Sequence, residues 1–212
     1  MSENRRAYMT ALFGFDAVVQ RVEPNQWGQQ SPCDRWDARG VLNHNIVVAH
    51  MIVEMTKGKS AAVPATGAKG ERAVPHGEGF VFASHLASAP RIGEGNDPFV
   101  VWNERRDLVQ EALDTPEAVA TLVRSPWGHN TVDEFLGFAF YDPLVHTWDL
   151  AKAVDQPVFL DPALVERALS MLEDPGDERN LRQPISLAEP VATTAADSAS
   201  RLIALTGRDP AS

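Results

Sequence analysis

The chain has 212 residues, of which 44% are hydrophobic and 23% are charged, with a formal net charge of -10 and a pI near 5.0. This is the composition of an ordinary globular protein, with enough residues for one large core. Because the net charge is negative and the arginines are scattered, the composition argues against nucleic acid as a partner. We therefore expect a small-molecule partner.

One cysteine is present, Cys33, so an intramolecular disulfide and a cysteine-rich zinc knuckle are excluded. A single cysteine fits a reducing cytoplasm. The first residues lead into an amphipathic segment and not into the apolar core of a signal peptide. No window has the length of a charge-free membrane-spanning helix. We therefore expect a cytoplasmic protein without a membrane partner.

Apolar residues at helical spacing predict three helices in the first half of the chain. The first covers residues 4–22. The second runs over residues 37–57, with Asp37 as its N-cap. The third covers residues 97–114, where Asp97 is a cap followed by a proline at the first helical position.

Residues 58–96 separate the second and third helices and are rich in glycine, alanine, proline and serine. A connection of this length is unusual in a compact domain and is often a functional lid. Residues 80–86 predict a short helix inside it. Two interpretations stay open for the 58–96 segment: a lid over a site on the bundle, or a wall of a different substrate pocket.

The most apolar helix is predicted over residues 131–154. Thr131 and Glu134, three positions apart, are typical of a capping box at its start. Pro143 lies inside this helix and removes one backbone hydrogen bond, so we expect a kink beside Asp142.

The last part of the chain predicts a helix over residues 161–172, a strand-like stretch over residues 185–191, and a closing helix over residues 195–206 that ends at Gly207. The order of elements is mostly helical. We therefore expect a mainly α fold, with a four-helix bundle over residues 1–155 and a small C-terminal α(+β) extension over residues 156–212 that packs on the bundle.

Asp142, His146 and Asp149 lie at positions i, i+4 and i+7 of the most apolar helix and share one face. Burying an unpaired charge costs roughly several kcal/mol, so these side chains need partners. His44, on the second helix, is also surrounded by aliphatic residues. His44, Asp142 and His146 are therefore candidate ligands of a divalent metal, Zn²⁺ or else Ni²⁺, Fe²⁺ or Mn²⁺.

The alternative is that Asp142 and His146 form a buried ion pair and that His44 is an ordinary core histidine. Asp149, one turn beyond His146, could orient the free ring nitrogen of that histidine, or could cap the helix or face solvent. No catalytic residue is assigned from the pattern.

The other chemically active side chains have simpler interpretations. His50 lies on a largely different helix face from His44, and we expect it to be structural. Cys33 has no base beside it in the sequence and is interpreted as a small buried turn residue. Surface positions are expected for His76, His85 and His129, and the alternative for His85 and His129, which are predicted in loops, is that they reach the site as acid, base or substrate contacts. Core positions are expected for Trp36, Trp102 and Trp148.

Four motifs are recognisable: SPCDRWD at residues 31–37, LNH at 42–44, DPLVHTWDLA at 142–151 and LIALTGRDP at 202–210. Together they resemble the actinobacterial metal-binding proteins related to mycothiol-dependent maleylpyruvate isomerase, over nearly the whole chain. The resemblance implies a DinB-like four-helix bundle.

In that fold a divalent metal is held by a histidine of the second helix and by a carboxylate-x-x-x-histidine pair of the fourth helix. The corresponding residues here are His44, Asp142 and His146. Asp142 stands where the isomerase-like pattern has glutamate.

The resemblance also implies a low-molecular-weight thiol such as mycothiol as cosubstrate, because a metal-bound thiol loses its proton near neutral pH and becomes a nucleophile. The first hypothesis is a zinc-dependent thiol transferase or isomerase acting on a small electrophile. Two alternatives stay open: a hydrolase that uses metal-bound water, and a non-catalytic metal- or ligand-binding module. The substrate, and whether the bundle forms a homodimer, also stay open.

Overall fold

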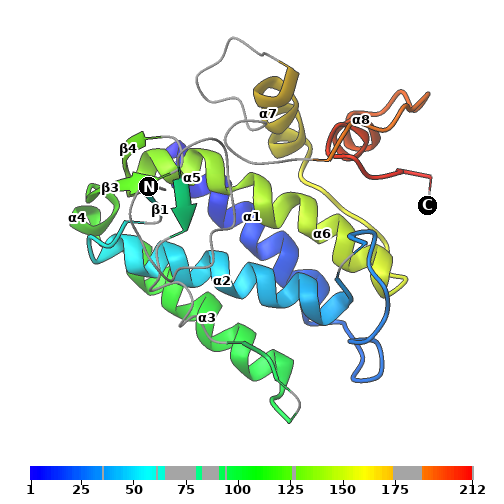
Figure 1. The fold of residues 1–212 in the computed structure, drawn as a ribbon, viewed down its shortest axis with the longest axis horizontal. Coiled ribbons are helices and arrows are strands. Elements are labelled where there is room, and N and C mark those ends of the chain that lie inside the picture. Colours follow the sequence, from blue (N-terminus) through cyan, green and yellow to red (C-terminus); the bar gives the residue numbers. More distant parts are fainter. Residues whose placement is uncertain are drawn as a thin grey trace.

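A computed structural model describes most of the chain, and of residues 62–64 and 80–82 it describes the backbone alone. The described residues are 1–34, 36–60, 62–64, 80–82, 91–93, 95–125, 128–173 and 188–211. They are mainly helical, and the N-terminal helices form a bundle with two further helices beside it (Figure 1). The expectation of a mainly α fold is confirmed.

The bundle consists of α1 (Glu3–Val19), α2 (Ala38–Thr56), α3 (Pro98–Leu113) and the consecutive helices α5 (Val132–Ala139) and α6 (Tyr141–Ala153). Both α1 and α2 pack against α3 and against α6. The helices α3 and α6 therefore each lie between α1 and α2, which is the arrangement of a four-helix bundle.

The polar residues predicted as helix caps occupy those positions. The side chain of Asp37 accepts a hydrogen bond from the Gly40 N–H at 2.7 Å, and the side chain of Asp97 accepts one from the Phe99 N–H at 2.9 Å. These bonds satisfy N–H groups that have no partner within the helix. The first helix ends at Val19, three residues before the predicted end.

The helix predicted over residues 131–154 is interrupted near Pro143, as expected, but it breaks into two helices at Phe140, two residues before the predicted kink at Asp142. The cause is Pro143, which has no N–H to donate to the carbonyl of Ala139, four residues earlier. The predicted capping box is present at the start of α5, where Thr131 and Glu134 exchange hydrogen bonds. The break places Asp142 in the first turn of α6.

Short elements that the sequence did not predict lie between the helices. Helix α4 (Pro116–Val119) leads into an antiparallel hairpin of β3 (Leu122–Ser125) and β4 (Gly128–Thr131). A second antiparallel pair is formed by β1 (Ala62–Pro64) and β2 (Phe80–Phe82).

The strand β2 corrects the prediction of a short helix over residues 80–86, as far as the structure describes it. Residues 83–86, and most of the predicted 58–96 lid, lie outside the described residues. The role of that segment therefore stays a prediction.

The C-terminal extension contains α7 (Pro162–Glu173) and α8 (Ser198–Leu205), which pack against each other. Residues 188–191 do not form the expected strand, and 185–187 lie outside the described residues. Arg167 of α7 donates to the side chain of Asn4 at 2.6 Å. The extension therefore contacts the bundle, while the boundary near residue 155 stays a prediction.

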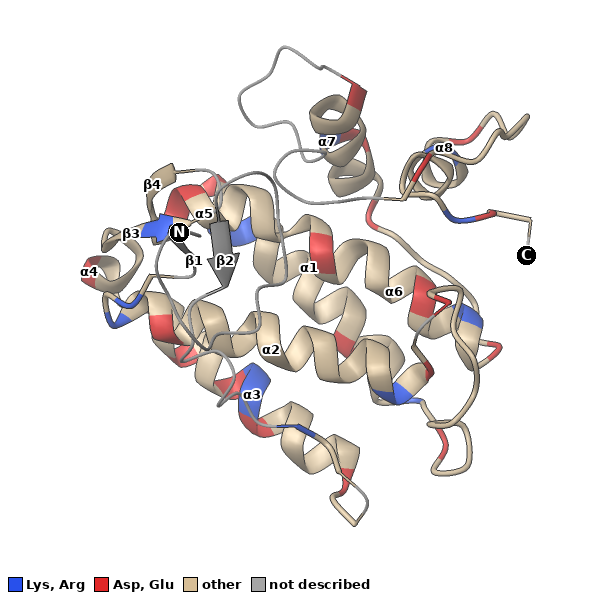
Figure 2. Ribbon diagram, viewed as in Figure 1, with Lys and Arg blue, Asp and Glu red and all other residues tan. Residues whose placement is uncertain are grey.

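The core lies between the bundle helices and is aliphatic and aromatic. Its largest fully buried side chains include Tyr8, Phe15, Leu42, Ile46, Trp102, Leu136, Phe140 and Leu150. Acidic and basic residues are intermixed along the helices (Figure 2). Within the described parts of the chain, none of the helices has the length and apolar character needed to cross a membrane.

Candidate metal centre

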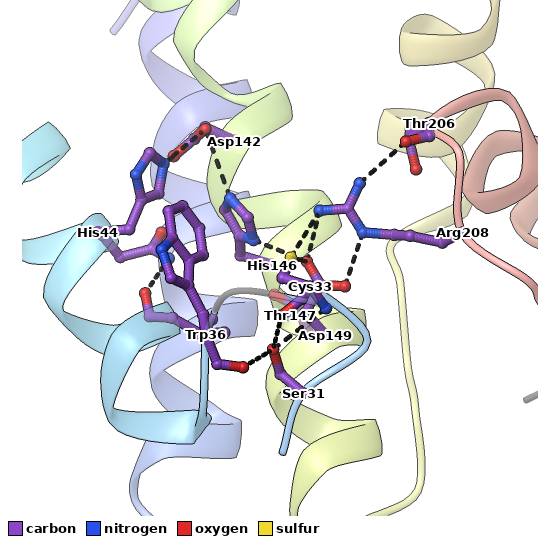
Figure 3. Close-up of polar contacts among 12 residues, drawn as sticks. Ser31, Cys33, Trp36, His44, Asp142, His146, Thr147, Asp149, Thr206 and Arg208 are labelled. Carbon is purple, nitrogen blue, oxygen red and sulfur yellow. Dashed lines mark hydrogen bonds and ion pairs between the residues drawn. The ribbon is translucent and has the colours of Figure 1, made fainter. Parts of the chain in front are cut away.

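The three predicted ligands meet at the interface of two helices. His44 comes from α2, and Asp142 and His146 come from α6 (Figure 3). Their ligand atoms all lie within 4.8 Å of one another. The structure therefore brings together the residues that the sequence pattern selected, while their role as metal ligands stays a prediction.

The local sequence explains how these side chains reach one point. Asp142 lies in the first turn of α6, where the positive end of the helix dipole favours a carboxylate. His146 follows four residues later, so it points to the same side of α6. Contacts between α2 and α6 bring His44 opposite this pair.

His44 and Asp142 are in direct contact. Nε2 of His44 lies 2.9 Å and 3.0 Å from the two carboxylate oxygens of Asp142. Burial is the largest single effect and lowers the pKa of His44, but the charge and hydrogen bond of Asp142 and the charge of Asp149 together raise it by more, so the pKa lies above its ordinary value. Burial is the largest single effect and raises the pKa of Asp142, but the charges of His44, His146 and Arg208 and the hydrogen bond of His44 together lower it by more.

The centre is partly exposed, because 29% of the His44 side chain and 26% of the Asp142 side chain are accessible to solvent. The phenol of Tyr8 is close to Asp142 and is buried. Its burial and the charge of Asp142 both raise the pKa of Tyr8, so its hydroxyl keeps its proton near neutral pH.

His146 is oriented by Asp149, as one of the predicted alternatives has it. Nδ1 of His146 lies 2.7 Å from Oδ2 of Asp149, whose side chain is fully buried. An ionised carboxylate can only accept, so Nδ1 carries the proton, and when the ring is neutral Nε2 has a free lone pair. That nitrogen faces Oδ1 of Asp142 at 3.8 Å, which is too long for a hydrogen bond.

Asp149 has a second strong partner that the sequence pattern did not reveal. Arg208, beyond α8, donates from Nε to Oδ1 and from Nη2 to Oδ2 of Asp149, each at 2.7 Å. Burial raises the pKa of Asp149, but the hydrogen bonds from His146 and Arg208 lower it to about 2. The LIALTGRDP motif included Arg208, but nothing in its spacing indicated a partner on another helix.

Cys33 belongs to the same network. Its Sγ lies 3.3 Å from Oδ2 of Asp149 and 3.2 Å from Nη2 of Arg208. Burial and the charge of Asp149 raise the pKa of Cys33 to about 12, so the thiol stays protonated near neutral pH. This agrees with the expectation that Cys33 is not a nucleophile.

Cys33, His146 and Asp149 form a second group of potential metal ligands, again within 4.8 Å of one another. The guanidinium of Arg208 already contacts two of them and supplies the positive charge that a metal ion would bring. The group of His44, Asp142 and His146 is therefore the better candidate.

Trp36 forms one wall of the centre. Its ring stacks on His44 with 4.8 Å between centroids and an interplanar angle of 29°, and it lies 5.6 Å from the ring of His146. The interpretation of Trp36 as a core residue is therefore incomplete. Trp102 and Trp148, by contrast, are buried as expected.

The remaining histidines lie elsewhere. Nδ1 of His50 is 3.3 Å from Nη1 of Arg105, which fits the structural role expected for it. His129 is exposed, as expected, although it lies on β4 and not in a loop. His76 and His85 lie outside the described residues.

A cleft of about 480 Å³ lies beside the Arg208 end of this network. The residues that line it are Gln30, Ser31, Pro32, Asp34, Val191, Gly207, Arg208 and Asp209. Its volume is in the range of small-molecule sites, about 300–1,000 Å³. The network of charged side chains therefore has room for a ligand on that side.

Residues 10–151 match the sequence model of the family described as the mycothiol maleylpyruvate isomerase N-terminal domain. Two similar proteins from Mycobacterium tuberculosis are the uncharacterized protein Rv0738 of strain H37Rv and the uncharacterized protein MT0763 of strain CDC 1551 / Oshkosh. Each is 27% identical over 162 residues, which cover 76% of this chain and 73% of the relative. No solved structure matches the chain significantly.

Proposed function

Because the chain belongs to the mycothiol maleylpyruvate isomerase N-terminal domain family, we propose that it is a divalent-metal enzyme that uses a low-molecular-weight thiol. The thiol is of the mycothiol type, and the reaction is a transfer to, or an isomerisation of, a small electrophile. His44, Asp142 and His146 hold the metal, which is Zn²⁺ or a related ion such as Ni²⁺, Fe²⁺ or Mn²⁺.

The observation that carries the metal assignment is the position of Nε2 of His146. In the neutral ring its lone pair faces a carboxylate oxygen of Asp142 at 3.8 Å, and a cation shared by these two acceptors would stabilise both. Zn–N and Zn–O bonds of about 2 Å put neighbouring ligand atoms of one ion roughly 3 Å apart. Asp142 lies 2.9 Å from His44 and 3.8 Å from His146, close to this value, and all the ligand atoms lie within 4.8 Å of one another.

The donor set also fits a catalytic ion. Two imidazoles and one carboxylate suit zinc and its divalent neighbours, and three protein ligands leave a position for a substrate. When bound, such an ion lowers the pKa of a coordinated thiol, so that the thiolate is available near neutral pH.

The side chains of the protein have supporting roles in this proposal. Asp149 fixes the ring of His146, and Trp36 shields one face of His44 from water. The only cysteine of the chain, Cys33, keeps its proton because its pKa is raised to about 12. The thiol nucleophile must therefore come from a cosubstrate.

The test combines the zinc-loaded protein with mycothiol and a panel of small electrophiles, including maleylpyruvate, an epoxide and an alkyl halide. Consumption of the thiol and the mass of the product are followed. We expect turnover that needs both metal and thiol. His146→Ala should lose it, whereas His50→Ala, which removes a histidine of α2 away from the centre, should retain it.

Two results would contradict the thiol proposal in different ways. Equal turnover with and without thiol would identify a hydrolase that uses water. A metal-loaded protein that converts none of the electrophiles would be better described as a metal- or ligand-binding module.

A further inference from the structure

We infer that Arg208 is a positioning residue for the metal ligand His146 and that it acts through Asp149. The inference rests on the metal centre of the proposed function, but it does not depend on thiol chemistry. Under this inference the C-terminal extension orients one ligand of the metal centre, although all three proposed ligands belong to the bundle.

Arg208 and Asp149 form an ion pair with two hydrogen bonds. Arg208 contacts both oxygens of Asp149 at 2.7 Å, the two-pronged arrangement that fixes a carboxylate most firmly. The Oδ2 atom also accepts from Nδ1 of His146 at 2.7 Å. The plane of the carboxylate, and with it the direction of the histidine ring, is therefore fixed through Nδ1, which leaves Nε2 facing Asp142.

Both partners of the ion pair are largely buried. The side chain of Asp149 has no exposed surface, and the side chain of Arg208 is 14% exposed. Desolvation makes such a pair costly to bury, so its net contribution to folding stability is small. The pair is better explained by the orientation of His146. Both oxygens of Asp149 are hydrogen-bonded to Arg208, and one of them also accepts from His146.

The turn before Arg208 sets the direction of its side chain. Gly207, directly before it, has a φ of 83°, a left-handed conformation that favours glycine. A Cβ at this position would collide with Cβ of Ala188 and lie 3.0 Å from the carbonyl oxygen of Glu189. The Nη1 atom of Arg208 donates to the carbonyl of Thr206 at 3.2 Å. The turn after α8 therefore points the guanidinium into the bundle.

Arg208 lies outside the part of the chain that matches the family model. The family model covers residues 10–151 and ends before Arg208. Asp149 lies at the end of that range, and its guanidinium partner follows 59 positions later. The bundle alone therefore contains the carboxylate but lacks the group that holds it.

The consequence concerns metal affinity. Without Arg208, the buried Asp149 loses two charge-assisted hydrogen bonds, and its carboxylate can turn away from His146. Loss of such an outer partner typically weakens metal binding by about 10- to 100-fold. The same loss should leave the ring of His146 free to adopt the other tautomer.

The test measures Zn²⁺ affinity by competition with a chromophoric chelator, using the full-length protein. We expect Arg208→Ala to bind Zn²⁺ about 10- to 100-fold more weakly than wild type. Arg208→Lys should bind Zn²⁺ with an affinity between those of wild type and Arg208→Ala, because the lysine ammonium keeps the positive charge but cannot donate to both oxygens of Asp149 in the same two-pronged way. The control is Arg201→Ala, which removes an arginine of the same extension paired with the exposed Glu173, and its affinity should stay within about twofold of wild type.

A second readout follows the histidine itself. In the ¹⁵N NMR spectrum of the metal-free wild type, His146 should show a protonated Nδ1 and an unprotonated Nε2. In Arg208→Ala the signals should move toward a mixture of the two tautomers, which a loss of global stability alone would not produce.

A folded Arg208→Ala protein with wild-type Zn²⁺ affinity would overturn the inference. Should that variant fail to fold by circular dichroism, Arg208→Gln, which has similar length and no charge, replaces it with the same two outcomes. A wild type that binds no Zn²⁺ would contradict the proposed function itself. A wild type and a variant that bind Zn²⁺ equally would contradict only the role of Arg208.

Discussion

At the scale of single residues, Asp149 connects the metal centre to the rest of the molecule. It is fully buried and interacts with His146, Arg208 and Cys33. Each of these partners comes from a different part of the chain. The ionised carboxylate is therefore the point through which the orientation of His146 depends on distant segments.

The pKa of Asp149 leads to a prediction about acid stability. Its pKa falls from 3.8 to about 2 in the folded protein. A lowered carboxyl pKa adds stability above pH 4, and that stability is lost as the pH falls from 4 to 2. A shift of nearly two units corresponds to about 2 kcal/mol in the free energy of unfolding.

The measurement compares the free energy of unfolding of wild type and Asp149→Asn at several pH values between 2 and 5. The advantage of wild type over the variant should shrink by about 2 kcal/mol between pH 4 and pH 2. A difference that stays constant over this range would mean that Asp149 does not titrate as described.

Part of the centre could be predicted from the sequence at this scale. Asp142, His146 and Asp149 share one helix face because of their spacing, and His44 was selected by its apolar surroundings and by the family motifs. Arg208 and Cys33 could not be assigned, because they approach Asp149 from 59 and 116 positions away and tertiary contacts of this kind have no periodic signature.

At the scale of elements, the starts of helices could be predicted from the sequence more accurately than the points at which a helix is interrupted. Asp37, Asp97 and Thr131 are caps because their side chains accept from the first free N–H groups, which is a local effect. Pro143 predicted an interruption between α5 and α6, but its place at Phe140 and the hairpin of β3 and β4 were not predicted. Strands of four residues are too short for a reliable alternating pattern.

The start of α2 gives a prediction in which packing opposes helix propensity. Alanine in place of Gly40 would favour the helix by about 1 kcal/mol. Its Cβ, however, would lie 2.9 Å from Cβ of Trp36, the residue that stacks on His44. Overpacking of this kind costs about 1–3 kcal/mol, so we expect Gly40→Ala to lower the free energy of unfolding.

The matched control is Gly14→Ala in α1. The nearest atom to a Cβ there is Oγ1 of Thr147 at 4.0 Å, so the methyl group has room. Chemical denaturation should show that Gly14→Ala is about 0.5–1 kcal/mol more stable than wild type. Equal stabilisation by both substitutions would show that Trp36 is not fixed against α2.

At the scale of the whole molecule, the bundle and the C-terminal extension meet at the centre. The bundle supplies His44, Asp142, His146 and Asp149, and the extension supplies Arg208. The mainly helical fold was predictable from composition and apolar periodicity. The way the extension returns to the bundle was not, because it depends on the turn at Gly207 and on long-range contacts.

Metal binding should stabilise the whole molecule, because the ligands come from two helices that separate on unfolding. Binding at a free Zn²⁺ concentration of 100 times Kd adds about 2.7 kcal/mol. For a protein of this size the melting temperature should rise by roughly 5–10 °C. Differential scanning fluorimetry with and without a chelator measures this shift.

The control for the thermal shift is Asp142→Asn, which removes the charge of one proposed ligand. Its melting temperature should be nearly independent of Zn²⁺. A variant that is stabilised as strongly as wild type would place the bound ion elsewhere on the protein.

The most direct measurement is the metal content of the purified protein by elemental mass spectrometry, for wild type, His44→Ala and Asp142→Ala. The account predicts close to one divalent ion per chain in wild type and little or none in either variant. Metal-free protein in all three samples, even after reconstitution with Zn²⁺, would contradict it, and the contact between His44 and Asp142 would then be an ion pair in a helical binding module.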